Sequence, residues 1–216
     1  MSSHPSDRKL ILHLCADIGS DSRAYDLDPQ YEVFRVGADI GVENFSAEAF
    51  FPGRRVHGIM ANPVCSEFQT VNGYGKVNDT EKGMFLVRHC MRVVNECGPV
   101  WWVLENPARG MLRRFIGPPA HTYQPWQYGS PWTKHTALWG CFTMPEPLYR
   151  RWEEVPDRLP IYTRPGRGKP NLAFLHKSEA VKIPEMAWAV GRISSDMDLR
   201  SMCSAGFAEE FKKVNP

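Results

Sequence analysis

The sequence predicts an α/β fold with a mainly parallel, twisted sheet, followed by a loop-rich basic segment. Two observations favour this class. Short apolar runs alternate with helical or turn-rich stretches along the first two thirds of the chain, as in sheets built from strand–crossover–strand units. Prolines then interrupt residues 143–200 too often for regular structure. The chain has 216 residues, of which 43% are hydrophobic, so it is long enough to bury a core.

The strands are expected at apolar runs that end in turn residues. The first run, KLILHLCA, is followed by the polar turn DIGSDS, and the third ends at Asn62-Pro63. The fourth, VWWVLENP, is stopped by Pro107. The five runs cover residues 9–16, 31–37, 55–63, 100–107 and 136–142.

Two segments have the pattern of amphipathic helices. Residues 80–97 carry apolar side chains at helical spacing, with Asp79 or Thr80 as the N-cap and Gly98-Pro99 as the stop. The apolar positions of this helix are Met84, Val87, Met91, Val94 and Cys97. The last stretch, SAGFAEEFKKVNP, is also expected to be helical, because two phenylalanines stand four residues apart.

Charge and cysteine usage narrow the class of protein. The net charge is +2, which excludes a histone-like polycation. Residues 1–108 carry 10 basic and 14 acidic side chains, and residues 109–216 carry 16 and 10, so an anionic partner is expected on the second half. No apolar run reaches the roughly 20 residues that span a bilayer, and the polar N-terminus predicts an intracellular protein. The six cysteines lack zinc-ligand spacing, so no metal is expected.

Chemically unusual residues follow the predicted strands. Cys65 comes directly after the third strand, on a turn made rigid by Pro63, which can aim its thiol into a cleft. Glu105 closes a run of Val and Trp, where partial desolvation favours the protonated form of a carboxyl. In parallel sheets ligands bind at the carboxyl ends of the strands. Together the two residues predict a thiol nucleophile and an acid at one pocket. Taken alone, Cys65 is also typical of a buried cysteine at a strand end, and Glu105 of a carboxylate in a turn or helix cap.

Four motifs in order resemble the compact DNA cytosine-C5 methyltransferases of phages and bacteria. They are LHLCADIGSDS, MANPVCSEFQ, WWVLENP and YGSPWTKHTALWG, and the resemblance runs from about residue 9 to 216. The family's Pro-Pro-Cys element is matched by Pro63-Val64-Cys65, and its Glu-Asn-Val or Glu-Asn-Pro element by Glu105-Asn106-Pro107. Its Gly-rich cofactor turn is matched by Asp17-Ile18-Gly19-Ser20. The final helix resembles the segment by which the family's C-terminus returns to the cofactor pocket.

The resemblance implies a Rossmann-like methyltransferase fold and a DNA (cytosine-5-)-methyltransferase that uses S-adenosyl-L-methionine. In this chemistry a thiolate adds to cytosine C6 and makes C5 nucleophilic. Cys65 would be that covalent catalyst, and Glu105 would assist at N3. The cycle requires no metal. DNA would be the partner, in the cytoplasm of a bacterial cell or a phage-infected host.

Cofactor and substrate contacts are expected from the matched motifs and from the strand ends. Gly19 would allow close backbone approach, and Asp39 or Glu43 after the second strand would bind a ribose. The full set of expected cofactor residues is Asp17, Ile18, Gly19, Ser20, Asp39, Glu43, Asn62 and Pro63. The expected substrate contacts are Ser66, Gln69, Asn106, Lys134 and Thr136.

Residues 1–142 and 201–216 are expected to form the catalytic, cofactor-binding domain. Residues 143–200 would be a reduced target-recognition or DNA-contact region, so recognition is expected to be short, relaxed or supplied by a partner protein. The sequence departs from the family at Val64, which replaces the second proline of the turn. Three alternatives stay open: a C5 transferase acting on a free nucleotide, carboxymethyl transfer from a modified cofactor, and a non-catalytic DNA-binding protein on a degenerate methyltransferase fold.

Overall fold

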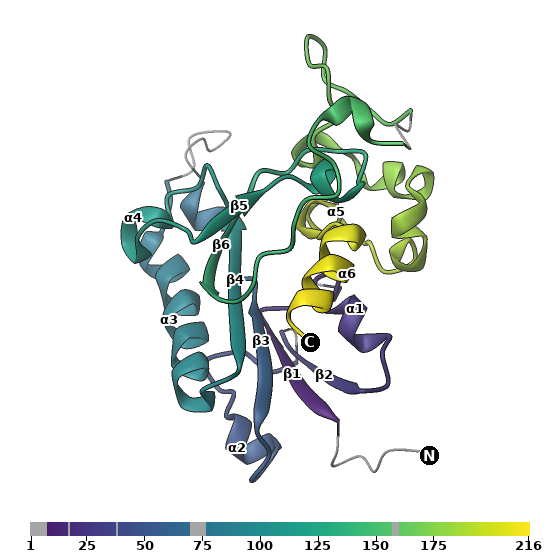
Figure 1. The fold of residues 1–216 in the computed structure, drawn as a ribbon. Coiled ribbons are helices and arrows are strands. Elements are labelled where there is room, and N and C mark those ends of the chain that lie inside the picture. Colours follow the sequence, from purple (N-terminus) through teal and green to yellow (C-terminus); the bar gives the residue numbers. More distant parts are fainter. Residues whose placement is uncertain (1–7, 17, 38, 70–76, 157–159) are drawn as a thin grey trace. The chain divides into compact units, whose positions relative to one another are not determined.

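The computed structural model describes residues 8–16, 18–37, 39–69, 77–156 and 160–216 (Figure 1). The chain divides into two compact units. The first unit consists of Met1–Ala16, Tyr25–Thr122 and Thr136–Phe142. The second consists of Asp17–Ala24, Tyr123–His135 and Thr143–Pro216.

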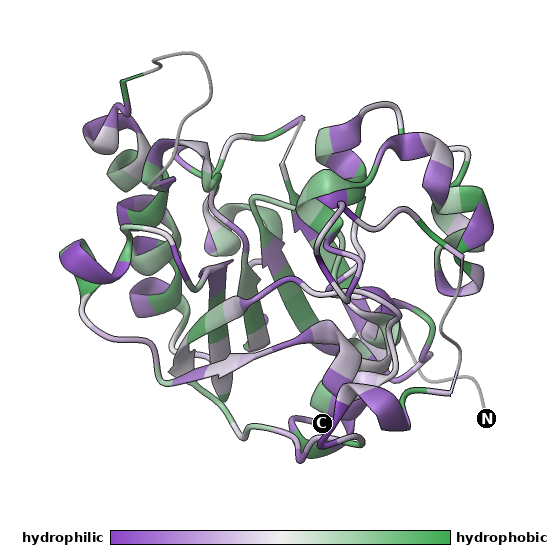
Figure 2. Ribbon diagram, turned by 90° about the horizontal axis from the view of Figure 1, so that it is seen from above, coloured by the Kyte–Doolittle hydropathy of each residue, from purple (hydrophilic) through white to green (hydrophobic). Residues whose placement is uncertain are grey.

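The first unit is built on a six-stranded sheet with the order β2-β1-β3-β4-β6-β5. The strands are β1 (Lys9–Leu14), β2 (Tyr31–Val36), β3 (Val56–Ala61), β4 (Trp101–Pro107), β5 (His121–Tyr123) and β6 (Thr136–Cys141). Strands β1 to β4 are parallel, and β6 runs antiparallel to β4. The predicted α/β class with a mainly parallel sheet is confirmed, and its apolar strands stand out in Figure 2.

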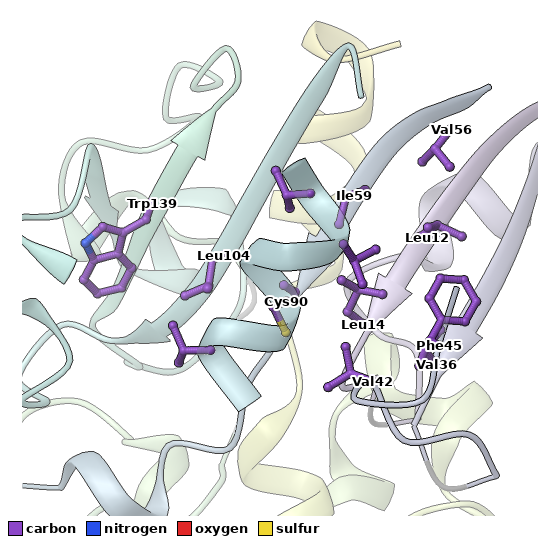
Figure 3. Packing of buried hydrophobic residues seen from close by; sticks show 14 of the residues in the cluster. Leu12, Leu14, Val36, Val42, Phe45, Val56, Ile59, Cys90, Leu104 and Trp139 are labelled. Atoms are coloured by element: carbon purple, nitrogen blue, oxygen red, sulfur yellow. The ribbon is translucent and has the colours of Figure 1, made fainter. Parts of the chain in front are cut away.

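Helix α3 (Thr80–Cys97) covers one face of the sheet and has the predicted bounds. The Asp79 side chain accepts a hydrogen bond from the Lys82 amide at its start, and Gly98 ends it in the left-handed conformation (φ 51°). Of the predicted apolar positions, Val87 and Val94 are buried and Met84 and Cys97 pack partly buried against the core, whereas Met91 is half-buried; Cys90 and Val93 are buried in addition. Figure 3 shows this core, in which α3 packs over Leu14, Ile59, Leu104 and their neighbours.

Shorter helices fill the connections of the chain. The α-helices are α1 (Arg23–Asp26), α2 (Ala47–Phe50), α4 (Arg113–Ile116), α5 (Asp196–Ser201) and α6 (Ala205–Val214). The 3-10 helices are η2 (Ser66–Phe68), η4 (Pro125–Tyr128), η5 (Trp152–Glu154), η6 (Leu172–Phe174), η7 (Lys177–Lys182) and η8 (Pro184–Ala189). Helix α6 confirms the predicted C-terminal helix. No helix in the described part of the chain is long and apolar enough to cross a membrane.

The second unit has an apolar core of its own. Trp132, Leu172, Met186 and Leu199 are fully buried at its centre. The aromatic ring of Phe207 on α6 stacks on Tyr123, with ring centroids 3.9 Å apart. Residues 143–200 are loop-rich, because their described part forms only 3-10 helices of three to six residues and the start of α5.

The two compact units do not coincide with the predicted domain ranges. Residues 17–24, 123–135 and 201–216 belong to the second unit, whereas the sequence groups them with the catalytic residues. The role of residues 143–200 in contacting DNA stays a prediction.

Candidate active site

The carboxyl ends of β1, β3 and β4 form one edge of the sheet. In the parallel register Leu14 lies opposite Ala61, and Ala61 lies opposite Leu104. Glu105 is the next residue after Leu104 on β4, and Cys65 comes four residues after Ala61, the last residue of β3. Ligands bind at this edge in open α/β sheets.

The turn that leads to Cys65 is held by side chains from both neighbouring strands. On β1, His13 Nε2 forms a 2.8 Å hydrogen bond with Asn62 Oδ1. The backbone amide of Asn62 also donates a hydrogen bond to the Leu14 carbonyl. From β4, the Asn106 amide nitrogen Nδ2 donates to the Pro63 carbonyl over 3.0 Å. His13 and Asn106 are both buried, so water does not compete for these bonds. The turn is thus fixed before the nucleophile candidate is reached.

Cys65 itself is half-buried and stands directly before η2. Its carbonyl accepts a hydrogen bond from the Phe68 amide, which closes the 3-10 turn. Glu67 on this turn is buried, with 8% of its surface exposed, and its Oε2 accepts a 2.9 Å hydrogen bond from the Asp79 amide. Because Asp79 is the N-cap of α3, Glu67 anchors the turn of Cys65 to the start of this helix.

Glu105 is half-buried on β4, with its Oε1 atom shielded from solvent. Its backbone is fixed by antiparallel pairing with Leu138 of β6. Side chains alternate along a strand, so Glu105 lies on the sheet face opposite to Leu104, which packs in the α3 core. A carboxyl shielded at one oxygen and placed at a strand end suits hydrogen bonding to a polar ring.

The predicted cofactor turn lies in the second unit. Asp17 is outside the described residues. Gly19 has a φ of 88°, a conformation that other residues rarely adopt, and this requirement explains the glycine. The Ser20 hydroxyl accepts a hydrogen bond from the Cys203 amide over 3.0 Å and donates to Asp21. The segment before α6 therefore contacts the turn that contains Ile18 and Ser20, and whether this turn binds a cofactor stays a prediction.

The other cofactor candidates lie in the first unit. Asp39 and Glu43 are exposed after β2, and Glu43 folds back so that a Cβ atom at Gly41 would meet its carboxylate. Asn62 is half-buried and Pro63 is buried, both within the turn described above. The predicted role of these residues in binding a cofactor stays a prediction.

The predicted substrate contacts differ in how accessible they are. Gln69 is exposed and Ser66 is half-buried, close in sequence to Cys65. Thr136, in contrast, is fully buried at the start of β6, where it pairs with Pro107. The Lys134 amine donates to the carbonyls of Ser201 and Met202. The surroundings of Thr136 and Lys134 favour a supporting role within the protein.

Sequence reasoning missed His13 and Glu67. His13 is the one polar residue inside the apolar run KLILHL, and this was the only signal for it. Glu67 gave no signal, because its partner Asp79 stands twelve residues away. Among the described residues, no group of His, Cys, Asp and Glu is arranged to hold a metal ion.

Comparisons with known proteins show a likeness to solved structures. No family model matches the chain. No curated protein matches it either. A solved structure from E. coli, described as a DNA modification methyltransferase encoded within a prophage, aligns over 62% of this chain with 19% sequence identity and a TM-score of 0.45. The match spans 46% of that protein, so the aligned part is less than half of its length.

Proposed function

We propose that this protein transfers a methyl group to C5 of cytosine in DNA, with Cys65 as covalent catalyst and Glu105 assisting at N3. The observation that carries the proposal is the position of the two residues. Cys65 follows β3, and Glu105 lies near the end of the neighbouring parallel strand β4. Asn106, adjacent to Glu105, donates a hydrogen bond to the Pro63 carbonyl in the turn of Cys65. This hydrogen bond joins the strand that carries Glu105 to the turn that carries Cys65.

The residues of the chain would act in a definite order. The Cys65 thiolate forms a bond to C6 of the cytosine ring, and the electron pair of the C5–C6 double bond becomes available at C5. Glu105 stabilises this state by holding a proton at N3. After C5 has gained its new substituent, loss of the C5 proton restores the double bond. The sulfur–C6 bond then breaks, and Cys65 is regenerated.

The cofactor implied by this chemistry is S-adenosyl-L-methionine, which supplies an electrophilic methyl group. Its proposed contacts are the backbone of Ile18, Gly19 and Ser20, together with Asp39 or Glu43 and Asn62. The Ser20 hydroxyl already bonds within the second unit, so we assign the contact of this residue to its backbone.

The decisive experiment is mass spectrometry of the bases in DNA incubated with the purified protein and S-adenosyl-L-methionine. We expect 5-methylcytosine with the native protein, none with Cys65→Ala, and strongly reduced formation with Glu105→Gln. Cys141→Ala is the matched control, because Cys141 is an exposed cysteine at the end of β6. A fully active Cys65→Ala variant would contradict the covalent mechanism.

The same assay separates the alternatives. A second arm offers dCMP in place of duplex DNA, and methylation of dCMP alone would identify a nucleotide-modifying enzyme. A product heavier than 5-methylcytosine would identify a modified cofactor. A third arm uses DNA that contains 5-fluorocytosine, in which fluorine blocks the final elimination, and we expect a covalent complex that depends on Cys65.

A further inference from the structure

A second pair of thiols lies apart from Cys65, between β1 and α3. Cys15 follows β1 directly, and Cys90 lies in the middle of α3. Their Sγ atoms are 3.7 Å apart, although the residues are 75 positions apart in sequence. Cys90 is fully buried, whereas Cys15 is half-buried. A small reagent in solution can therefore reach the Cys15 thiol, whereas the Cys90 thiol is shielded from solvent.

The two thiols differ chemically. The hydrogen bond between them lowers the pKa of Cys15 and raises the pKa of Cys90, and burial raises the pKa of Cys90 further. The negative charge of Glu43 acts against this effect at Cys15 but is the smallest of the three causes. Since the thiolate is the nucleophile in thiol chemistry, Cys15 is the thiol that reacts first.

The backbone at Cys15 is also unusual. Its φ of 52° is positive, and among the described residues no other non-glycine residue has a positive φ. Such a conformation is unfavourable for a cysteine, so the surrounding structure must hold it. The Ala16 amide, which follows, donates to the Val36 carbonyl on β2. The side chain of Cys15 is thereby turned toward Cys90 rather than continuing the alternation of β1.

We propose that Cys15 and Cys90 form a redox-sensitive pair, which a hydroperoxide converts into a disulfide that ties the end of β1 to α3. The Cys15 thiolate attacks the peroxide oxygen, the O–O bond breaks, and Cys15 becomes a sulfenic acid while hydroxide leaves. The Cys90 thiol then attacks the Cys15 sulfur, the S–O bond breaks, and water leaves as the disulfide forms. The peroxide is reduced by two electrons, and the two thiols supply them.

The test counts oxidised cysteines in the full-length protein. Native protein is treated with hydrogen peroxide, its remaining thiols are blocked with N-ethylmaleimide, and it is digested without reduction for mass spectrometry. We expect a cross-linked species that joins the Cys15 and Cys90 peptides and has lost two hydrogen atoms. The exposed Cys141 serves as the internal control, since no thiol is paired with it in the described residues.

Two variants make the result specific. In Cys90→Ser the Cys15 sulfenic acid has no resolving thiol, and we expect dimedone to trap it. In Cys15→Ser we expect Cys90 to stay reduced, because it is buried. A native protein in which Cys15 is oxidised while Cys90 remains a thiol, or in which Cys15 joins another cysteine, would overturn the proposal. Because the readout is the state of the thiols, it is independent of whether the protein methylates cytosine.

Discussion

The side-chain amide of Asn106 donates a hydrogen bond to the Pro63 carbonyl, over 3.0 Å, and so joins the end of β4 to the turn after β3. Asn106 is 1% exposed, and its Oδ1 has no hydrogen-bond partner among the described residues. Only the donor end of the amide therefore has a structural partner in that region. The turn that leads to Cys65 is therefore held by Asn106, a residue 43 positions after Pro63 in the sequence.

Asn106→Asp is expected to destabilise the first unit. A carboxylate cannot donate to the Pro63 carbonyl, and it places a charge where almost no solvent reaches. We expect the free energy of unfolding to fall by about 1–3 kcal/mol, measured by urea denaturation. Asn95→Asp, at an exposed position of α3, is the matched control and should change little. Equal stabilities of the two variants would contradict the role assigned to Asn106.

The hydrogen bond between His13 and Asn62 is expected to contribute to the same turn. His13→Leu and Asn62→Leu, alone and combined, form a double-mutant cycle. We expect a coupling of about 0.5–1.5 kcal/mol in the free energy of unfolding, because each single change leaves one polar partner behind. We also expect a lower kcat for methyl transfer in both single variants. A coupling near zero would show that the two side chains act independently.

Gly140→Ala is expected to disturb the pairing of β4 and β6. Gly140 has a φ of 142°, and a Cβ atom there would collide with the Trp102 carbonyl. We expect a loss of about 1–3 kcal/mol, because either the strand pairing or the backbone must shift. Gly168→Ala is the control, since a Cβ atom at Gly168 would meet nothing within 4 Å. Thermal unfolding of the two variants, compared side by side, measures the difference.

Glu185 is expected to make the second unit pH-sensitive. Burial raises the pKa of its carboxyl to about 7, although Ser130 and the Ala205 amide donate hydrogen bonds that act the other way. An ordinary glutamate in the unfolded chain has a pKa of about 4.3. The carboxyl therefore binds its proton more tightly in the folded state. Its contribution to stability is complete below about pH 4.3 and is lost as the pH rises to about 7.

We expect the native protein to lose roughly 2–3 kcal/mol between these pH values, an order-of-magnitude figure from the pKa difference. Glu185→Gln should remove this slope. Glu179→Gln is the contrasting control, because Lys182 lowers the pKa of Glu179, and the contribution of Glu179 is lost only as the pH falls through that lowered value. Urea denaturation between pH 5 and 8 measures the slope, and a slope that persists in Glu185→Gln would refute the assignment.

Much of the sheet could be predicted because burial on both faces produces apolar runs, and each run ends in a turn residue. The direction of β6 could not, since an apolar run reads the same in a parallel and an antiparallel strand. The helical spacing of α3 predicts the buried positions Val87 and Val94, but it does not separate Met91, which is half-buried, from the buried Cys90 and Val93, because this difference depends on the packing partners. Strand β5, with three residues, is too short for a periodic signal.

The candidate site divides in the same way. Cys65 and Glu105 could be found because they stand at strand ends, where polar residues are unexpected after apolar runs. His13 and Glu67 could not, because their partners are distant in sequence and only the fold brings them together. The place of Lys134 in the family resemblance predicts a substrate contact, and this stays a prediction. The sequence gives no sign that its amine donates to the backbone carbonyls of Ser201 and Met202, which are distant in sequence.

The chain passes between the two compact units five times, after residues 16, 24, 122, 135 and 142. No single cut can therefore release either unit as one continuous piece. Removal of residues 143–216 as one block would leave residues 17–24 and 123–135 of the second unit without the rest of their core. Neither unit can therefore be transplanted as one continuous segment, and the residues of each unit are better examined by point substitutions within the intact chain.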